Sequence, residues 1–469
     1  MITDDTIVAL SSGTGGAIAV IRMSGVQCAE ICDRVVRSAK GRSVANSKGY
    51  TMLYGDVVEA DGSVIDDAVV AIYKAPHSYT GEDMVEITVH ASRYIIRRTI
   101  ARLVEAGARA ATAGEFTARA FLAGRMDLSQ AEAVADIIAS HDRATHHLAS
   151  RQMRGGYSDE LQGLRGRLLH LAAMLELELD FGEEDVEFAD RSELRALMAE
   201  IAEKIESLTS SFTLGRAIKE GVGVAIVGRP NAGKSTLLNT LLHDQRAIVS
   251  DVAGTTRDVI EEHLDIDGVD FRFIDTAGLH SSNDMLEQMG MERSRKAIEE
   301  AHIILALVDG TTLLPESAEE AKNSVLEVLG EIGCGADERC LVVINKSDVA
   351  VCDCSAVAEK LDAVLPHPAV TISAKSGVGV DELMQGISAM IDSQRIYTDA
   401  VTVSGARHYE ALVRAADALA RARENLNIAS PEMTARDIRE VLDLLGTITG
   451  EVTSDQILSE IFSKFCIGK

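Results

Sequence analysis

The spacing of apolar positions changes three times along the chain, and each stretch predicts a different kind of structure. Up to about residue 118, short apolar runs bounded by turn residues indicate a small α+β unit. Its strands are expected at Ala17–Ile21, Met52–Val58, Ala68–Tyr73 and Met84–Val89, and one helix is expected from about Ser92 to Glu105.

The next stretch, from about Phe116 to Arg216, has a helical pattern, with leucines three and four residues apart at Leu161, Leu164, Leu168, Leu171 and Leu175. From about Glu220 to Ser393, apolar runs alternate with helix-length stretches. These runs are Val222–Val227, Phe271–Ile274, Ile303–Val308 and Leu341–Ile344. Such alternation is typical of a parallel sheet covered by helices on both faces.

After about Ser404 the pattern is helical again, so the simplest architecture is an α/β domain inserted into a helical domain. The predicted fold is therefore multidomain, with α+β and α/β parts. Its domains are residues 1–118, an N-terminal α+β domain; 119–217, the first part of the helical domain; 218–393, the inserted domain; and 394–469, the second part of the helical domain.

Composition narrows the function classes. The net charge of −27 argues against a protein that coats nucleic acid by bulk electrostatics. Ala91–Arg125 contains seven arginines and Glu176–Asp190 eight acidic residues, and solvated helix faces are the simpler interpretation of both. The chain shows neither a signal peptide nor an apolar run of the ~20 residues that span a bilayer, so we expect a cytoplasmic protein without membrane contact. Its seven cysteines are expected to be reduced, with metal binding at Cys352-x-Cys354 as the alternative.

A phosphate-binding loop follows the strand Val222–Val227. Gly228-x4-Gly233-Lys234-Ser235 places glycines where backbone N–H groups must approach phosphate oxygens, a lysine for the β- and γ-phosphates, and a hydroxyl for Mg²⁺. The predicted nucleotide-binding residues here are Asn231, Ala232, Gly233, Lys234, Ser235 and Thr236.

Two further segments complete the predicted phosphate site. Asp275-Thr276-Ala277-Gly278 follows an apolar strand, where an aspartate holds Mg²⁺ through water and a glycine N–H meets the γ-phosphate. Gly254-Thr-Thr-Arg-Asp258, between the phosphate loop and Asp275, is interpreted as the first switch, with Thr256 as a Mg²⁺ ligand. The predicted nucleotide-binding residues in and just before it are Ser250, Asp251, Val252, Ala253, Gly254, Thr255 and Thr256.

The base is predicted to be guanine. Asn345-Lys346-Ser-Asp348 follows the strand Leu341–Ile344, and its aspartate can accept from both N1–H and the exocyclic amine, a donor pair that adenine lacks. Ser373, Ala374 and Lys375 are the companion loop. Together these segments predict GTP as the ligand and GTP hydrolysis as the reaction.

The residue after Asp275–Gly278 is Leu279, which cannot orient the attacking water as the glutamine of common small GTPases does. Another group must do so. Asn231 offers a side-chain oxygen to a monovalent cation lying where the charge of an arginine finger would sit.

With these motifs, the chain resembles the MnmE (TrmE) family of tRNA-modification GTPases over its whole length. The specific segments are Gly114–Phe121, Asp127–Ala133, the GTPase motifs and the tail Phe465-Cys-Ile-Gly-Lys469. The resemblance implies an N-terminal domain that binds tetrahydrofolate and forms a homodimer, and an inserted Ras-like P-loop GTPase domain activated by K⁺.

The resemblance also implies roles for individual residues. It implies K⁺ ligands at Asn231, Ser250, Val252 and Thr255, and Mg²⁺ ligands at Ser235 and Thr256. Glu287 matches the family's catalytic glutamate, which orients water; by itself it would be interpreted as a solvent-facing helix carboxylate.

For the folate derivative, methylene- or formyl-tetrahydrofolate, the matching residues are Arg22, Glu82, Arg125 and Lys469. A lysine is common where Arg125 stands, and Ser11–Gly16 lacks the basic residue often found there. Cys466 is either a functional thiol beside the one-carbon unit or a small packed residue.

The implied partners are GTP, tRNA, a second copy of the chain and an FAD-dependent protein of the MnmG type. Together they would form the 5-carboxymethylaminomethyl or aminomethyl group on the wobble uridine of certain tRNAs. Two alternatives remain: a GTP-regulated ribosome-assembly factor, which usually carries a strongly basic RNA-binding domain, and a stand-alone folate-dependent transferase, which leaves the GTPase motifs unexplained.

Overall fold

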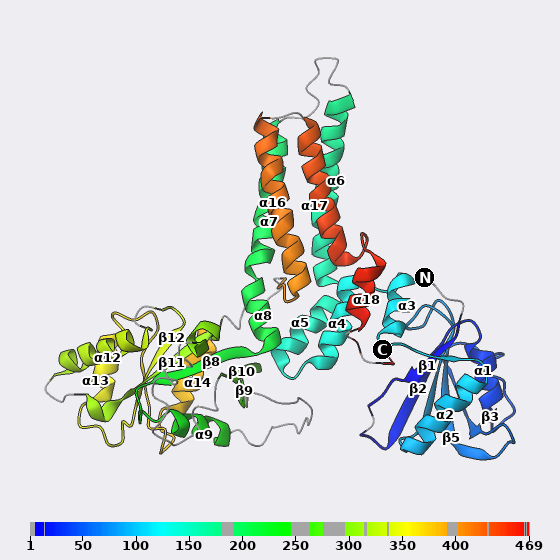
Figure 1. The fold of residues 1–469 in the computed structure, drawn as a ribbon, viewed down its shortest axis with the longest axis horizontal. Helices are drawn as coiled ribbons and strands as arrows, with labels where there is room; N and C mark the ends of the chain where they lie inside the picture. Colours follow the sequence, from blue (N-terminus) through cyan, green and yellow to red (C-terminus); the bar gives the residue numbers. More distant parts are fainter. Residues whose placement is uncertain are drawn as a thin grey trace. The chain divides into compact units, whose positions relative to one another are not determined.

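The computed structural model describes residues 5–13, 15–180, 191–244, 262–274, 296–313, 317–334, 337–391, 401–428, 431–463, 465 and 467–468. The chain divides into two compact units. One unit contains residues 1–138, 151–202 and 411–469, and the other contains residues 139–150 and 203–410. Figure 1 labels the helices and strands of both units. No helix in the described part of the chain is long and apolar enough to cross a membrane.

The first unit opens with a seven-stranded sheet. Its strands are β1 (Ile7–Leu10), β2 (Ile18–Ser24), β3 (Val36–Ser38), β4 (Thr51–Val58), β5 (Val64–Tyr73), β6 (Met84–His90) and β7 (Arg109–Ala110). The strand order is β3-β4-β5-β6-β2-β1-β7, antiparallel throughout except for the parallel pair β1 and β7. The four strands expected from the sequence are β2, β4, β5 and β6, with ends shifted by a few residues.

Helices α1 (Cys28–Val35) and α2 (Arg93–Glu105) cover one face of this sheet (Figure 1). Ile21 and Ile87 on the strands are fully buried in one core with Ile31 and Leu103 of these helices. Because successive residues of a strand point to opposite faces of the sheet, every second residue faces this core. The other face of β1 packs on Phe116. The expected helix from about Ser92 is α2, while α1 was not expected.

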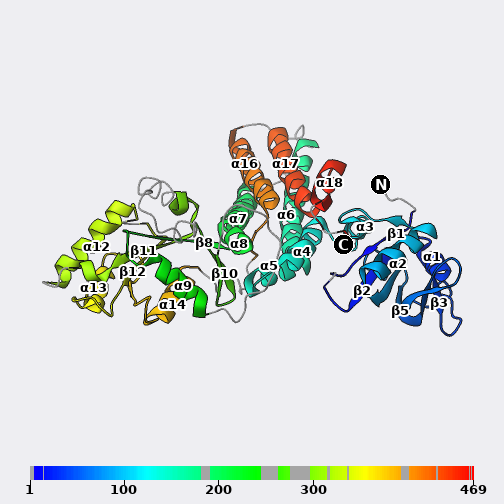
Figure 2. The same cartoon turned by 60° about the horizontal axis from the view of Figure 1, so that its bottom comes forward.

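The helical part contains nine described helices. They are α3 (Glu115–Leu122), α4 (Leu128–Ala139), α5 (Arg143–Met153), α6 (Gly156–Asp180), α7 (Arg191–Ser210), α8 (Phe212–Glu220), α16 (Ala406–Ile428), α17 (Pro431–Thr449) and α18 (Asp455–Ser463). Figures 1 and 2 both show α6, α7, α16 and α17 side by side as a bundle. The five leucines at helical spacing all lie on α6 and are buried, so the predicted apolar face is confirmed.

The end of the chain lies against the N-terminal sheet. Ile467 forms an antiparallel bridge with Ala113, just before α3. A Cβ on Gly468 would lie 1.9 Å from the carbonyl oxygen of Leu10, so only glycine fits there, and its φ of +100° suits glycine as well. The tail is therefore packed on β1, whereas Cys466 and Lys469 lie outside the described residues.

The second unit contains a six-stranded sheet with helices on both faces. Its strands are β8 (Val222–Gly228), β9 (Glu262–Ile266), β10 (Val269–Phe273), β11 (Ile303–Asp309), β12 (Cys340–Asn345) and β13 (Val370–Thr371). The order is β13-β12-β11-β8-β10-β9, parallel except for the edge strand β9. Helices α9 (Lys234–Asp244) and α14 (Val380–Met390) contribute to the core on one face, and α12 (Ala318–Ile332) and α13 (Cys354–Leu361) to the core on the other. The expected doubly covered sheet is confirmed, although the antiparallel β9 was not anticipated.

The segments that enter and leave the sheet domain lie side by side. A Cβ on Gly215 of α8 would be 2.2 Å from the carbonyl oxygen of Val403, and the Val403 N–H donates to Ser211 Oγ at 3.0 Å. This contact supports the predicted insertion of an α/β domain into a helical one. The residue limits assigned to the four parts remain predictions.

Candidate functional site

The phosphate loop connects β8 to α9. Two of its residues have positive φ angles, 63° at Asn231 and 100° at Gly233, so the backbone turns sharply between strand and helix. Ser235 and Thr236 then occupy the first turn of α9, where the backbone N–H groups of a helix N-terminus and the helix dipole favour an anion. The loop thus has the shape that a phosphate-binding loop needs.

Lys234 points back into its own loop. Its Nζ donates to the carbonyl oxygens of Gly228 at 2.9 Å and of Arg229 at 3.1 Å. Burial lowers the pKa of Lys234 from its ordinary value, because loss of hydration disfavours the charged form. An ammonium group held this way gains most from an anion placed in the loop.

Asn345, at the end of β12, ties three segments together. Its Nδ2 donates to the carbonyl oxygen of Ala232 at 2.8 Å, and its Oδ1 accepts from the Ala374 N–H at 2.9 Å. The side chain is 2% exposed, so both hydrogen bonds form away from water. Thr240 of α9 donates to the carbonyl oxygen of Ala374 at 2.6 Å and closes the arrangement. The loops predicted for phosphate and for base are therefore one connected structure.

Lys346 is fixed by the neighbouring strand. Its Nζ lies 2.6 Å from Asp309 Oδ2, at the end of β11. Burial alone would raise the pKa of Asp309, but the Lys346 ammonium and the Thr311 hydroxyl and N–H together hold it below its ordinary value. Asp348 and Lys375 are exposed, so both side chains are accessible to a base.

Several predicted residues lie outside the described part of the chain. These are Ser250–Thr256, Asp275–Gly278, Leu279, Glu287, Cys466 and Lys469. The described cysteines, including the neighbours Cys352 and Cys354 with an Sγ–Sγ distance of 3.8 Å, are free thiols.

In the N-terminal domain, Arg22, Glu82 and Arg125 gather around the loop between β5 and β6. A Cβ on Gly81 of that loop would lie 3.4 Å from Arg125 Cγ. The Arg22 guanidinium lies 5.1 Å from the centroid of the Tyr79 ring, which belongs to the same loop. Three of the four residues that the resemblance assigned to folate therefore share one region of the unit, and the fourth, Lys469, lies outside the described residues.

Arg22 is not a free cation. It faces Glu86 across β2 and β6, and its Nη2 lies 2.8 Å from Glu86 Oε1. Its guanidinium also lies 5.8 Å from the centroid of the Phe116 ring, a cation–π distance. No ion pair of Arg125 is found within the described ranges, and its side chain is exposed.

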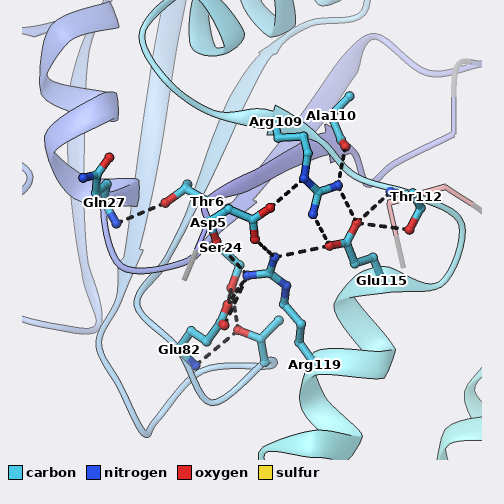
Figure 3. Close-up of polar contacts among 11 residues, drawn as sticks. Asp5, Thr6, Ser24, Gln27, Glu82, Arg109, Ala110, Thr112, Glu115 and Arg119 are labelled. Atoms are coloured by element: carbon cyan, nitrogen blue, oxygen red, sulfur yellow. Dashed lines mark hydrogen bonds and ion pairs between the residues drawn. The ribbon is translucent and has the colours of Figure 1, made fainter. Parts of the chain in front are cut away.

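Residues that the sequence analysis did not single out hold this region together. Tyr79 Oη lies 2.9 Å from Thr117 Oγ1. Arg119 donates to Glu82 at 3.2 Å (Figure 3), so α3 contacts the loop at two points. The resemblance had named Glu82 of this loop and the segment Gly114–Phe121 of α3. The resemblance therefore pointed to both segments separately, but only the fold shows that they are in contact.

Comparison with known proteins identifies the family. The model described as the MnmE helical domain matches residues 128–466, and the model of the GTP-binding protein TrmE N-terminus matches residues 6–125. The tRNA modification GTPase MnmE of Bacteroides thetaiotaomicron is 45% identical over 474 residues, 99% of each chain. The protein of the same name from Flavobacterium johnsoniae is 43% identical over 475 residues, 100% of each chain, and that of Porphyromonas gingivalis is 46% identical over 473 residues, 99% of this chain and 98% of its own.

These matches span both units, and they agree with the nucleotide-binding geometry of β8, α9 and β12. The protein is a GTP hydrolase, and it belongs to the MnmE family of tRNA modification GTPases.

Proposed function

We propose that this chain is a K⁺-activated GTPase that forms the 5-carboxymethylaminomethyl or aminomethyl group on the wobble uridine of certain tRNAs. In this proposal it works with an FAD-dependent partner of the MnmG type and uses a folate one-carbon unit. The observation that carries the proposal is the pairing of two sites in one chain. A phosphate loop is tied to a guanine-reading loop through Asn345, and the N-terminal domain gathers Arg22, Glu82 and Arg125 in a separate cluster.

In the nucleotide site, Asn231 to Thr236 surround the phosphates, with Lys234 supplying the positive charge. Ser235 and Thr256 hold Mg²⁺, which neutralises charge on the phosphate oxygens. Asn345, Lys346 and Asp348, with Ser373 to Lys375, bind the guanine. The exposed Asp348 fits a role in which its carboxylate accepts hydrogen bonds from the base.

K⁺ activation rests on Asn231. This residue is exposed, has a φ of 63°, and its side chain makes no hydrogen bond within the described ranges, so its amide oxygen is available. Ser250, Val252 and Thr255 would supply the remaining protein ligands. Glu287 would orient the attacking water, a role that Leu279 cannot fill.

GTP turnover in KCl and in NaCl tests this part of the proposal. We expect turnover at least about tenfold faster in KCl, because K⁺ would supply charge where an arginine finger acts in other GTPases. Asn231→Ala should remove the difference while GDP binding persists. Equal rates of the unaltered protein in both salts would contradict K⁺ activation.

The residues present fit a folate derivative, provided that Arg22 does not supply a free charge to the ligand. Arg125 is exposed and suits the carboxylates of the folate tail, whereas the charge of Arg22 is already engaged by Glu86. Arg22, packed on Tyr79 and Phe116, would instead shape the pocket wall. Lys469 and Cys466 would complete the site, and bound tetrahydrofolate would supply the one-carbon unit.

The homodimer is proposed to form through the N-terminal domain. Met52 and Tyr54 of β4 are 72% and 56% exposed, and Tyr54 stands opposite the exposed Val69 of β5. Exposed apolar groups clustered on one sheet face are typical of an interaction surface. Light scattering should show Met52→Glu/Tyr54→Glu as a monomer, whereas Tyr94→Glu, an equally exposed site on α2, should remain a dimer. Dimers in both variants would place the interface elsewhere.

The alternative, a GTP-regulated ribosome-assembly factor, is disfavoured. Such proteins usually carry a strongly basic RNA-binding domain, whereas this chain has a net charge of −27 and full-length similarity to tRNA modification GTPases. The nucleotide site fits either function, so the N-terminal cluster is the feature that favours tRNA modification.

A further inference from the structure

Arg119 of α3 is the centre of a network of charged residues in the N-terminal domain (Figure 3). Its side chain is only 9% exposed, which is unusual for an arginine unless its guanidinium is well paired. Nothing in the chemistry proposed above requires this residue. Its contacts therefore need an explanation of their own.

The guanidinium of Arg119 joins three segments. Nη1 donates to the backbone carbonyl of Asp5 at 2.9 Å and to both carboxylate oxygens of Glu82, each at 3.2 Å. Nη2 donates to Asp5 Oδ1 at 2.6 Å and to Glu115 Oε1 at 3.2 Å. A planar fork with five N–H donors can make these contacts together, whereas a lysine ammonium cannot.

Glu82 is held from a second side as well. Ser24 Oγ donates to Glu82 Oε2 at 2.7 Å, and Ser24 Oγ in turn lies 2.6 Å from Thr80 Oγ1. The backbone of Glu82 is also fixed, because its carbonyl oxygen accepts from Ser78 Oγ at 2.6 Å. Glu82 is therefore a carboxylate with one orientation, yet its side chain remains 25% exposed.

The two carboxylate oxygens of Glu82 accept different numbers of hydrogen bonds. A carboxylate has about four lone-pair sites. Arg119 uses one on each oxygen and Ser24 uses one more on Oε2, so the remaining capacity lies on Oε1. A ligand donor arriving at Glu82 would therefore find Oε1.

We propose that Arg119 is a positioning residue for ligand binding in the N-terminal domain: it holds the Glu82 carboxylate so that Oε1 accepts an N–H donor of the folate derivative. This inference rests on the proposed folate site. Arg119 itself does not touch the ligand. It acts from the same helix that carries Phe116 and Thr117, which contact Arg22 and Tyr79, so α3 as a whole shapes the pocket.

The carboxylates around Arg119 explain why a guanidinium is needed to hold Glu82. Asp5, Glu82 and Glu115 converge on Arg119, whereas the ion pairs of Arg109 within the described ranges are with Asp5 and Glu115. Without Arg119, Glu82 would lose its ion pair and two nearby carboxylates would lose part of theirs. Glu82 would then be held by the Ser24 hydroxyl alone, and its carboxylate could rotate more readily.

The test is the affinity of the full-length protein for 5-formyltetrahydrofolate, measured by calorimetry at pH 7.5. We expect Arg119→Gln to weaken binding by at least about tenfold, the effect of losing a charge-assisted hydrogen bond. Glu82→Gln should weaken it similarly, and the double variant should bind within about twofold of Glu82→Gln alone, because the two residues act as one unit. A merely structural arginine would give additive losses instead.

Two further variants serve as controls. Arg109→Gln removes the other guanidinium of the network but no contact to Glu82, so its affinity should stay within about twofold of the unaltered protein. Ser24→Ala removes only the second anchor of Glu82 and should weaken binding even if Arg119→Gln fails to fold. GTP turnover of Arg109→Gln should equal that of the unaltered protein, which shows that this control is folded.

The possible results distinguish failure of the positioning role of Arg119 from failure of the proposed folate site. Tight binding by the unaltered protein together with unchanged affinity in Arg119→Gln, or with fully additive losses, would overturn the positioning role and leave the folate site intact. No binding of 5-formyltetrahydrofolate by the unaltered protein would overturn both. Weakened binding in Ser24→Ala and Arg119→Gln but not in Arg109→Gln is the expected result.

Discussion

Asn345 Nδ2 lies 2.8 Å from the carbonyl oxygen of Ala232, so the loop proposed to read the base is hydrogen-bonded to the loop proposed to hold the phosphates. The other end of the same amide, Oδ1, accepts from the Ala374 N–H at 2.9 Å. One buried side chain therefore sets the separation between phosphate and base pockets. This explains why an amide, with a donor and an acceptor side by side, occupies the position.

Replacing Asn345 should affect binding and stability together. Asn345→Ala leaves the Ala232 carbonyl and the Ala374 N–H without this partner, at a cost of about 1–3 kcal/mol for each buried group. GDP affinity, measured by calorimetry, should fall at least about tenfold. Asn345→Asp keeps the acceptor but loses the donor, and it brings a negative charge beside the phosphate loop. A GDP affinity of Asn345→Ala equal to that of the unaltered protein would show that the two loops keep their spacing without this residue.

Gly233 lies against the same side chain. A Cβ at this position would be 2.2 Å from Asn345 Nδ2, and the φ of +100° is strained for any other residue. We therefore expect Gly233→Ala to abolish detectable GTP turnover. The matched control is Gly330→Ala in α12, where nothing lies within 4 Å and alanine favours the helix, so turnover should be unchanged. Comparable turnover in the two variants would contradict the steric argument.

Much of this architecture was predictable, because its signals are local. Continuous apolar runs marked β8, β11 and β12, since strands buried on both faces need no alternation. The glycine, lysine and serine of the phosphate loop could be placed because their chemistry depends on the loop itself. By contrast, β9 alternates polar and apolar residues over only five positions, which is too short for a clear strand pattern. Its antiparallel pairing with β10 was not anticipated, although the turn between them is Asp267-Gly268, a two-residue hairpin signal with positive φ at both residues.

The N-terminal cluster shows where sequence reasoning stops. The resemblance assigned Arg22 to the folate site, but the register of β2 and β6 places Glu86 directly opposite it and the two side chains form an ion pair. A cross-strand partner depends on register, which these short strands do not reveal. Arg119 could not be assigned to Glu82 either, because the two residues lie 37 positions apart along the chain and only the fold brings them together.

A histidine in the second unit makes stability depend on pH. The Gly223 N–H donates to His302 Nδ1 at 3.0 Å, so the ring must be neutral on that nitrogen. Burial, followed by the charge of Arg272, lowers the pKa of His302 from its ordinary value. The unfolded chain therefore binds the proton more readily. The contribution of His302 is fully present above about pH 6.5 and is lost as the pH falls from there through the folded-state pKa.

Thermal melts at pH 7.5 and pH 5.5 check this prediction. His302→Asn cannot take up the proton, so its melting temperature should fall less between the two pH values than that of the unaltered protein. His170→Asn, which changes an exposed histidine of α6, should behave like the unaltered protein. The same pH dependence in His302→Asn and the unaltered protein would refute the assignment.

The most direct test of tRNA modification is mass analysis of the wobble nucleosides in tRNA from a strain lacking this chain. We predict that the aminomethyl-type wobble uridines disappear and that the unaltered gene restores them. Lys234→Ala, which disables the phosphate loop, and Arg125→Ala, which removes the free cation of the N-terminal cluster, should both fail to restore them. A nucleoside profile that is unchanged by loss of the chain would contradict the proposed function.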